Sequence, residues 1–448
     1  MMPVVLLTDA MVYLLLAVGV AGALWVRRHP HLLLPWQRVA RNGVGMASLI
    51  VLALFLLVGF LDSLHYRAAM PDRNNGHAVY SPEVLSAFDA AVGELRSRTE
   101  KTYSAPLAAY LYARETHESE DGKVLRDYPR LKFGGAHLAD PQRDWAGDVL
   151  KRALLGGGLG ALAGGMLILA FRRCAPMRRH GPMAVLLLAG VVIGSVASLA
   201  QVYHVLGTDK VGQDVLYLSL KSIRTGLVIG TVTTLVMLPF ALFLGVAAGY
   251  LRGWVDDVIQ YVYTVLSSIP SVLLIAAAVL MMQLVIEQHA DWFNTAAARA
   301  DVRLLCLCLI LGVTSWTGLC RLLRGETLKL REQEYIQAAQ AFGVSSFRIL
   351  TRHIVPNVMH IVLISVLMDF SGLVLAEAVL SYVGVGVDPA TISFGTMINA
   401  ARMEMGREPM VWWTLASAFS FMLVLVLSAN LFADAVRDAF DPRLNRSS

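Results

Sequence analysis

Charged residues and the sequence motifs of catalysis are scarce in this chain of 448 residues. Asp, Glu, Lys and Arg together make up 16% of it, and only four residues are cysteines. The sequence contains no Gly-x-x-x-x-Gly-Lys-Ser/Thr phosphate loop, no His-Glu-x-x-His pair and no cysteine cluster. We therefore expect that this chain is not an enzyme: it has no catalytic residue, no metal site and no bound cofactor, and it does not hydrolyse ATP itself.

Long apolar segments make up much of the sequence. The sequence is 56% hydrophobic, and its mean hydropathy of +0.59 exceeds that of a typical soluble domain. A helix needs about 20 apolar residues to cross the hydrocarbon layer of a membrane. We predict an all-α polytopic membrane protein with nine spans, near residues 10–26, 43–62, 153–171, 183–203, 224–250, 258–286, 302–320, 358–380 and 412–433.

Basic residues in the connecting segments predict the orientation of these spans. They follow spans one, three, seven and nine: Arg27, Arg28, Arg38, Arg41, Arg172, Arg173, Arg178, Arg179, Arg321, Arg324, Lys329, Arg331, Arg348, Arg352, Arg437, Arg443 and Arg446. Because these segments all fall on one side of the membrane, the positive-inside rule places the carboxyl terminus in the cytoplasm and the amino terminus outside. The first span lacks the exit of a cleavable signal peptide and is expected to remain as an anchor. The net charge of +5 then reflects topology, and nucleic-acid binding is not expected.

The four cysteines lie in or beside predicted spans or on the cytoplasmic side, where disulfides are not expected. They are Cys174, Cys306, Cys308 and Cys320. Two of them, Cys306 and Cys308, are two residues apart, so on a helix they point in different directions and are not expected to bind a metal together.

A polar segment between two apolar stretches has the pattern of an ordered loop. The run from Tyr335 to Phe342 contains helix formers and an apolar stripe, and Gly343 permits the positive φ that ends a helix. Ser345 and Ser346 are then placed to cap a second helix. The pattern predicts two short helices joined by a tight corner; the alternative from pattern alone is an amphipathic connector lying on the lipid surface.

This segment resembles the signature loop of permease subunits of ATP-binding-cassette (ABC) importers, in which Glu-Ala-Ala, three residues, Gly and a later Pro form the dock for an ATPase. The chain has the small residues, the glycine and Pro356 at the family spacing, with Gln337 in place of the glutamate. The resemblance implies that residues 321–357, here named the coupling loop, contact a partner ATPase. The residues it implicates are Tyr335, Gln337, Ala338, Ala339, Gly343, Arg348 and Pro356.

A second motif resembles the C-type permease subunits of dipeptide, oligopeptide and nickel importers. It reads His-x-Leu-Gly-Thr-Asp, two residues, Gly-Gln-Asp over residues 204–214, here named the motif segment, and Gln213 replaces the usual arginine. The matching positions are His204, Gly207, Thr208, Asp209, Gly212 and Asp214. Further likenesses follow at 248–256, 381–389 and 430–443, while Tyr261, Thr264 and Phe394 depart from the family pattern.

The resemblance implies a type I ABC importer permease core of six helices, with three further spans and a small external inserted domain. The expected parts are an extra span and linker over 1–42, a first core span at 43–62, the inserted domain over 63–150, two extra spans over 151–203, the core over 204–443 and a cytoplasmic tail over 444–448.

Residues 63–150, here named the insertion, are too long for an ordinary loop. Ser81-Pro82-Glu83 predicts the start of one helix, with its apolar face running to Leu95, and a second helix is expected over 107–113. The insertion would cover the permease mouth, meet a binding protein or serve as a solvated spacer.

Two acids, Asp369 and Glu377, fall within or at the end of the eighth predicted span. An ionised side chain near the membrane centre costs at least about 2.5 kcal/mol, so such groups usually face water or a partner. We expect Asp369 to border the transport path or the contact with a second permease; the alternative is a hydrogen-bonded structural acid. Pro239 and Pro270 are expected to kink their helices.

The resemblance implies several partners in a bacterial inner (cytoplasmic) membrane. They are a second homologous permease, two cytoplasmic ATPases that carry ATP and Mg²⁺, and an extracytoplasmic solute-binding protein. The cargo that the resemblance favours is a peptide, with a modified peptide or a nickel chelate as the alternatives. Two other functions stay open. An ion-coupled transporter acting alone predicts paired intramembrane charges and an inverted repeat, and the sequence supplies neither clearly. A scaffold that does not transport would explain the changed Gln337, Gln213 and Thr264.

Overall fold

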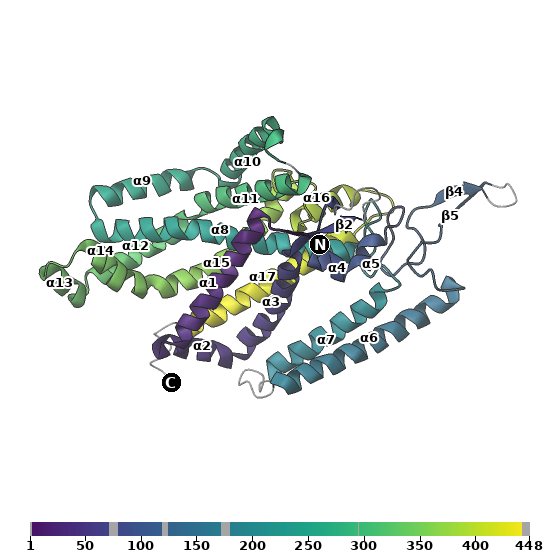
Figure 1. Ribbon diagram of the computed structural model, residues 1–448, viewed down its shortest axis with the longest axis horizontal. Coiled ribbons are helices and arrows are strands. Elements are labelled where there is room, and N and C mark those ends of the chain that lie inside the picture. The colour runs from purple at the N-terminus through teal and green to yellow at the C-terminus, as the bar shows by residue number, and fades with distance from the viewer. Residues whose placement is uncertain (1, 71–78, 119–123, 172–179, 294, 441–448) are drawn as a thin grey trace. The chain divides into compact units, whose positions relative to one another are not determined.

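Helices dominate the computed structural model, which describes residues 2–70, 79–118, 124–171, 180–293 and 295–440 (Figure 1). Within these ranges, nine helical segments are long and apolar enough to cross a membrane, which confirms the all-α polytopic fold class. They are α1 (Leu7–Arg27), α3 (Gly43–Asp62), α6 (Pro141–Phe171), α7 (His180–Ala200), α8 (Val215–Leu251), α10 (Ser271–Gln288), α11 (Ala296–Ser315) with α12 (Thr317–Arg331), α15 (Val355–Val383) with the short helices before it, and α17 (Trp413–Phe440).

Several helices begin where a polar side chain replaces the missing backbone partner of the first turn. The side chain of Asn42 accepts hydrogen bonds from the backbone N–H of Val44 and Gly45 at the start of α3, at 3.0 and 3.1 Å. Ser393 Oγ likewise accepts from Thr396 N–H at 3.0 Å, which opens α16 (Phe394–Glu404). These caps set the helix ends that the apolar pattern alone leaves undefined.

The predicted span at 258–286 is wrong as a single helix. The structure has α9 (Trp254–Ser268) and α10 on either side of Pro270, and only α10 qualifies as a span in the described chain. Because Pro270 restricts the residue before it to extended backbone, Ile269 has ψ 131°, and the expected kink is instead a break. Pro239, in contrast, lies inside α8.

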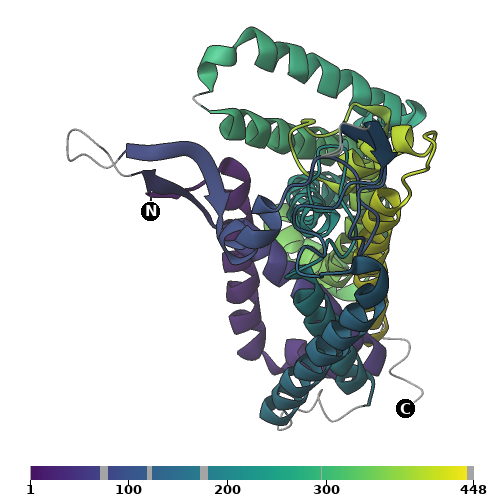
Figure 2. The same cartoon turned by 90° about the vertical axis from the view of Figure 1, so that its right-hand side faces the viewer.

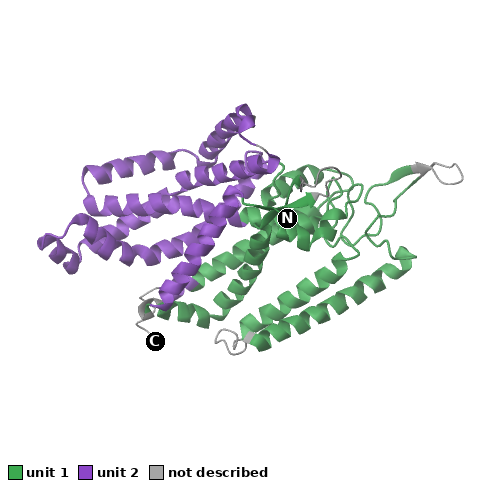
Figure 3. Cartoon of the chain, in the orientation of Figure 1, with its two compact units in different colours: residues 1–5, 29–226, 389–435 green, residues 6–28, 227–388, 436–448 purple. Residues whose placement is uncertain are grey.

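Contacts divide the chain into two units, drawn in two colours in Figure 3. Unit 1 comprises residues 1–5, 29–226 and 389–435, and unit 2 comprises residues 6–28, 227–388 and 436–448.

Unit 2 contains two apolar cores. One includes Leu323, Ile336, Ile349 and Ile354 from α12 and the coupling loop, and the other includes residues of α8, α10 and α11. Helix α1 packs on α11, where Thr8 donates a backbone hydrogen bond to Asp301 at 3.2 Å. The described cysteines Cys306, Cys308 and Cys320 are free thiols in this unit, while Cys174 lies outside the described residues.

In unit 1, helices α6 and α7 lie side by side along their length (Figure 1 and Figure 2). Glycines at the contact bring the two backbones together: a Cβ on Gly160 would overlap the carbonyl oxygen of Gly190, and one on Gly156 would overlap that of Gly194. The preceding helix α2 (Pro30–Arg41) packs beside α3, which also contacts α7.

The insertion contains strands that the sequence analysis did not predict. Strands β2 (His65–Met70) and β3 (Val79–Ser86) lie in the insertion, and β1 (Met2–Val4), which lies outside it, pairs with β2 to complete an antiparallel sheet in the order β1-β2-β3. A separate hairpin joins β4 (Glu115–Glu118) and β5 (Val124–Asp127). These small sheets supplement a helical chain.

In the insertion, the first predicted helix begins later than expected, and the second prediction is wrong because residues 107–113 are not helical. Ser81-Pro82-Glu83 lies within β3, because that segment pairs with β2, and the first helices are α4 (Ala87–Ala91), capped by Ser86, and α5 (Gly93–Ser97). Residues 107–113 form an irregular segment, which begins with Leu107 at a φ of 58° and is held by hydrogen bonds to distant backbone. Pairing with remote segments outweighs local helix propensity here.

Candidate functional site

The coupling loop consists of two short helices separated by a corner, as predicted. Helix α13 (Glu334–Ala341) ends before Gly343, which has a φ of +74°, and α14 (Ser346–Ile349) continues through a π-helical turn η3 (Leu350–Ile354) into α15. Ser345 occupies the cap position of α14 but makes no side-chain capping hydrogen bond. The glycine supplies the positive φ that turns the chain.

Three isoleucines fix this corner to the body of unit 2. Ile336, Ile349 and Ile354 are fully buried in the same core as Leu323 of α12. The loop is therefore an ordered extension of α12 and α15, since each of its short helices is anchored by an apolar side chain.

The outer surface of the loop carries the residues that the sequence implicated. Tyr335, Gln337, Ala338, Gly343, Arg348 and Pro356 are exposed, and Ala339 is half-buried. Phe342 and Phe347 were not predicted to face outward, yet they are 87% and 75% exposed on either side of Gly343. In the sequence, only the position of these two residues near Gly343 in a polar segment indicated that they could be exposed. The apolar stripe that was predicted to run from Tyr335 to Phe342 does not include the exposed Phe342.

Ion pairs join the coupling loop and α12 to the chain around α9. Arg324 donates two hydrogen bonds to Asp256, at 2.6 and 2.7 Å, and Arg252 pairs with Glu332 at 2.7 Å. A Cβ on Gly249 would lie 2.6 Å from Thr327, so the backbones also approach closely. The turn at residues 248–256, which resembles the family pattern, is thus held against the helix that leads into the loop.

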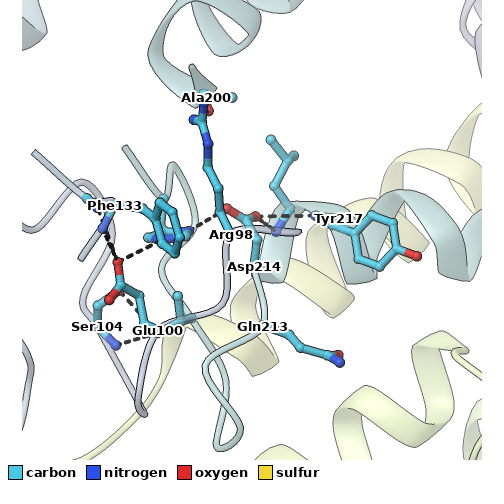
Figure 4. Close-up of polar contacts among 12 residues, drawn as sticks. Arg98, Glu100, Ser104, Phe133, Ala200, Gln213, Asp214 and Tyr217 are labelled. Carbon is cyan, nitrogen blue, oxygen red and sulfur yellow. Dashed lines mark hydrogen bonds and ion pairs between the residues drawn. The ribbon is translucent and has the colours of Figure 1, made fainter. Parts of the chain in front are cut away.

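The motif segment in unit 1 is organised around a buried histidine. Nδ1 of His204 lies 2.7 Å from Oδ2 of Asp214, and its Nε2 lies 3.4 Å from Oε1 of Glu100. Glu100 belongs to the insertion and also accepts hydrogen bonds from the N–H groups of Lys132, Phe133 and Gly134, as Figure 4 shows for Phe133. Sequence reasoning predicted His204 and Asp214 but missed Glu100.

The electrostatics of this cluster follow from its contacts. Burial alone would lower the pKa of His204, but Asp214 and Glu100 raise it to about 9. Burial would raise the pKa of Glu100, but the contacts with His204 and the three N–H groups lower it to about 2. At neutral pH the cluster therefore contains a protonated imidazole between two carboxylates.

The remaining motif residues shape the backbone around this cluster. Thr208 Oγ1 accepts a hydrogen bond from Ser104 N–H at 2.6 Å, and Thr208 O accepts one from Trp413 Nε1 at 3.0 Å. Asp209 accepts from Gln213 N–H at 2.8 Å and closes the turn. Asp214 accepts from Leu216 N–H at 2.8 Å and caps α8, which is why this helix starts at Val215 and not near residue 224.

The two motif glycines allow other backbone to approach. Gly207 and Gly212 have φ values of +74° and +76°, and a Cβ on Gly212 would overlap the carbonyl oxygen of Glu100. Any side chain at Gly212 would therefore displace the insertion. The insertion and the motif segment form one packed structure within unit 1.

A cavity of about 450 Å³ opens beside the motif segment. It is lined by Tyr103 of the insertion, Lys210 and Gln213 of the motif segment, and Glu404 and Thr414. Gln213, which replaces the family arginine, is turned away from the Glu100 contacts (Figure 4).

The two acids of α15 have different surroundings. Glu377 is 1% exposed and accepts a hydrogen bond from Ser381 Oγ at 2.7 Å. Asp369 is half-buried at the centre of the helix and forms no hydrogen bond or ion pair with any residue that the structure describes. The two sequence candidates thus lie on one helix without forming one site.

The long apolar helices define a multi-pass membrane protein. The chain belongs to the family described as binding-protein-dependent transport system inner membrane component, whose model matches residues 241–446, including the coupling loop. It is an ABC importer permease.

Curated relatives cover about half of the chain. The oligopeptide transport system permease protein OppC of Mycobacterium tuberculosis is 33% identical over 239 residues, which is 53% of this chain and 76% of that protein. The glutathione transport system permease protein GsiD of Pectobacterium atrosepticum is 32% identical, over 54% of this chain and 73% of that protein. The dipeptide permease DppC of Lactococcus lactis is 28% identical, over 54% and 64%.

A solved structure of the MetNI methionine ABC transporter, described as inward facing, aligns with 50% of this chain and 98% of its own. The sequence identity is 15% and the TM-score 0.38.

Proposed function

We propose that this chain imports peptides as one of two permease subunits driven by ATPases that dock on its coupling loop. The observation that carries the proposal is the construction of the loop: Ile336, Ile349 and Ile354 anchor it, while Phe342 and Phe347 extend from its outer surface. Exposed aromatic side chains on a rigid support are typical anchors of a protein interface. The curated relatives named for oligopeptides, dipeptides and glutathione support peptides as the cargo.

The connections of the loop support a mechanical role. It is continuous with α12 on one side and with α15 on the other, and these two helices contact each other. Partner ATPases would bind ATP and Mg²⁺ and move together on binding. Because the loop is packed into the core, a displacement at Phe342 and Phe347 would pass into α12 and α15 and drive the exchange between inward-open and outward-open states.

The proposed assembly has further subunits. A second homologous permease completes the path, two cytoplasmic ATPases supply the energy, and an extracytoplasmic solute-binding protein delivers the peptide. The chain resides in the bacterial inner membrane with its amino terminus outside and its carboxyl terminus in the cytoplasm. In this orientation the insertion and the motif segment face the binding protein, and the coupling loop faces the ATPases.

A co-purification experiment tests the docking surface. The chain is co-expressed with its partners as wild type, as the double variant Phe342→Ala/Phe347→Ala, and as a control, Trp292→Ala, whose side chain is 63% exposed outside the loop. Loss of two anchor side chains should weaken ATPase association at least about thirtyfold, since each interface hot spot contributes about 2 kcal/mol or more. The control should bind as wild type does.

Three outcomes separate this proposal from the alternatives. Full ATPase retention by the double variant would contradict the docking surface. Peptide uptake by the purified chain without any ATPase would identify a transporter acting alone, and ATPase turnover without uptake in the reconstituted complex would identify a scaffold.

A further inference from the structure

Asp369 differs from the buried acids in its unit. It is the central residue of α15, and no described residue donates a hydrogen bond to it or pairs with it. The five buried acids described in unit 2 all have contacts: Asp9 with Leu6, Asp256 with Arg324, Asp301 with Thr8, Glu377 with Ser381 and Asp388 with Arg303. A lone carboxylate at mid-span is costly unless water or a partner group reaches it.

The face of α15 around Asp369 has room for such a group. Its neighbours one turn away are Ser365, Val366, Gly372 and Leu373; Val366 and Leu373 pack into the core, whereas Ser365 and Gly372 are small, and a Cβ on Gly372 would meet no atom within 4 Å. Phe370, the next residue, packs so closely on α8 that a Cβ on Gly230 would overlap its ring. Phe370 and Leu373 therefore fix α15 to the core, while space remains beside Gly372, one turn from Asp369.

Contact with lipid does not explain an acidic side chain at this position. Acidic side chains in spans face a bundle interior or a water-filled cavity, because hydrocarbon offers no hydrogen bonds. The half-buried position of Asp369 is compatible with a path for polar cargo, which needs water and polar groups at mid-membrane. A carboxylate at that point attracts a cation and repels an anion.

We propose that Asp369 is a recognition site for a cationic group in the transport path, and that it receives the protonated amino terminus of the peptide. This inference rests on the proposed function, because it assumes that peptides cross this chain. An α-amino group has a pKa of about 8 and is mostly protonated at pH 7, so a peptide carries the required charge at one end. One carboxylate without further ligands favours entry of that group and still permits its release.

The test uses the complete transporter, with its partner subunits, reconstituted in vesicles at pH 7. Uptake of one tripeptide is compared with uptake of the same tripeptide acetylated at its amino terminus. The variants are Asp369→Asn, which removes the charge, Asp369→Glu, which keeps it, and Asp257→Asn, a control at an exposed acid in the first turn of α9. The binding protein is identical in every sample, so its own preference cancels when variants are compared with wild type.

We expect the uptake ratio of free to acetylated peptide to fall about tenfold in Asp369→Asn, consistent with loss of a charge-assisted contact. Asp369→Glu should restore most of the ratio, and Asp257→Asn should leave it unchanged. An unchanged ratio in Asp369→Asn would overturn the inference. Failure of Asp369→Asn to assemble, measured by size-exclusion chromatography, would overturn it in favour of a subunit contact. Absence of ATP-driven uptake of both peptides by the wild-type complex would instead overturn the proposed function, and this inference with it.

Discussion

Replacement of Glu100 by glutamine should loosen the insertion from the motif segment in a pH-dependent way. Glutamine keeps one oxygen, which can accept from the N–H groups of Phe133 and Gly134, but it turns an NH2 group toward the N–H of Lys132 and removes the negative charge beside His204. The protonated imidazole would then have only Asp214 as a counter-charge. Both partners of the lost pair are almost fully buried, so solvent does not screen their interaction strongly.

The magnitude follows from the pKa of His204. Raising it from 6.5 to about 9 corresponds to about 3 kcal/mol of stabilisation of the protonated imidazole, shared between Asp214 and Glu100. Glu100→Gln should therefore cost about 2 kcal/mol at pH 6, within the range for a hydrogen bond to a charged group. Because the folded-state pKa is raised, this stabilisation is complete below pH 6.5 and is lost as the pH rises through about 9.

Hydrogen–deuterium exchange of the amides at residues 132–134 and 204–214 measures this effect directly. After correction for intrinsic rates, exchange in Glu100→Gln should be about thirtyfold faster than wild type at pH 6, and the difference should shrink at pH 9.5. The matched control is Lys101→Ala, which removes the neighbouring ion pair with Glu115 at 2.8 Å. Lys101 is 71% exposed, so its loss should cost less than about 1 kcal/mol and depend little on pH over this range.

Two results would refute this reasoning. One is equal exchange in Glu100→Gln and Lys101→Ala at pH 6. The other is an effect of Glu100→Gln that is the same at pH 6 and pH 9.5, which would mean that His204 does not change its protonation over this pH range.

Two further variants test the packing of each unit. Gly160→Ala should destabilise the α6–α7 pair, since the new Cβ would overlap the backbone of Gly190. Its control is Gly158→Ala, whose new Cβ would meet no atom within 4 Å and should be neutral or slightly stabilising. Thermal unfolding in detergent compares the two variants, and equal melting temperatures would contradict the close contact. Arg324→Ala should leave the carboxylate of Asp256 without its two hydrogen bonds and speed proteolysis around residues 248–256, and an unchanged cleavage rate would show that the pair does not hold that turn.

The sequence predicted the spans well because apolar length is a local property. Nine spans were expected and nine are present in the described chain, and the end of α13 at Gly343 was expected from its glycine. The exceptions have local causes that hydropathy does not register. Pro270 divides one predicted span into α9 and α10, and Asp214 caps α8 well before its apolar stretch begins.

The insertion was harder to predict because remote contacts determine it. Ser81-Pro82-Glu83 has the pattern of a helix start, yet this segment belongs to β3, which pairs with β2 in a sheet. Glu100 has no motif around it, and its partner His204 is more than a hundred residues away in the sequence. The residues that match a family pattern could be located from the sequence, whereas the residue that completes their cluster required the structure.

The glycines between α6 and α7 also determine how that helix pair can adjust. They recur every fourth residue, at Gly156, Gly160 and Gly164 on one helix and at Gly190 and Gly194 on the other. A slide of four residues, about 6 Å, would place Gly160 against Gly194 and Gly164 against Gly190. The pair therefore has a smooth, repeating seam along which it can change its axial offset when the bilayer thins or thickens, while its leucine-rich outer surface keeps contact with lipid.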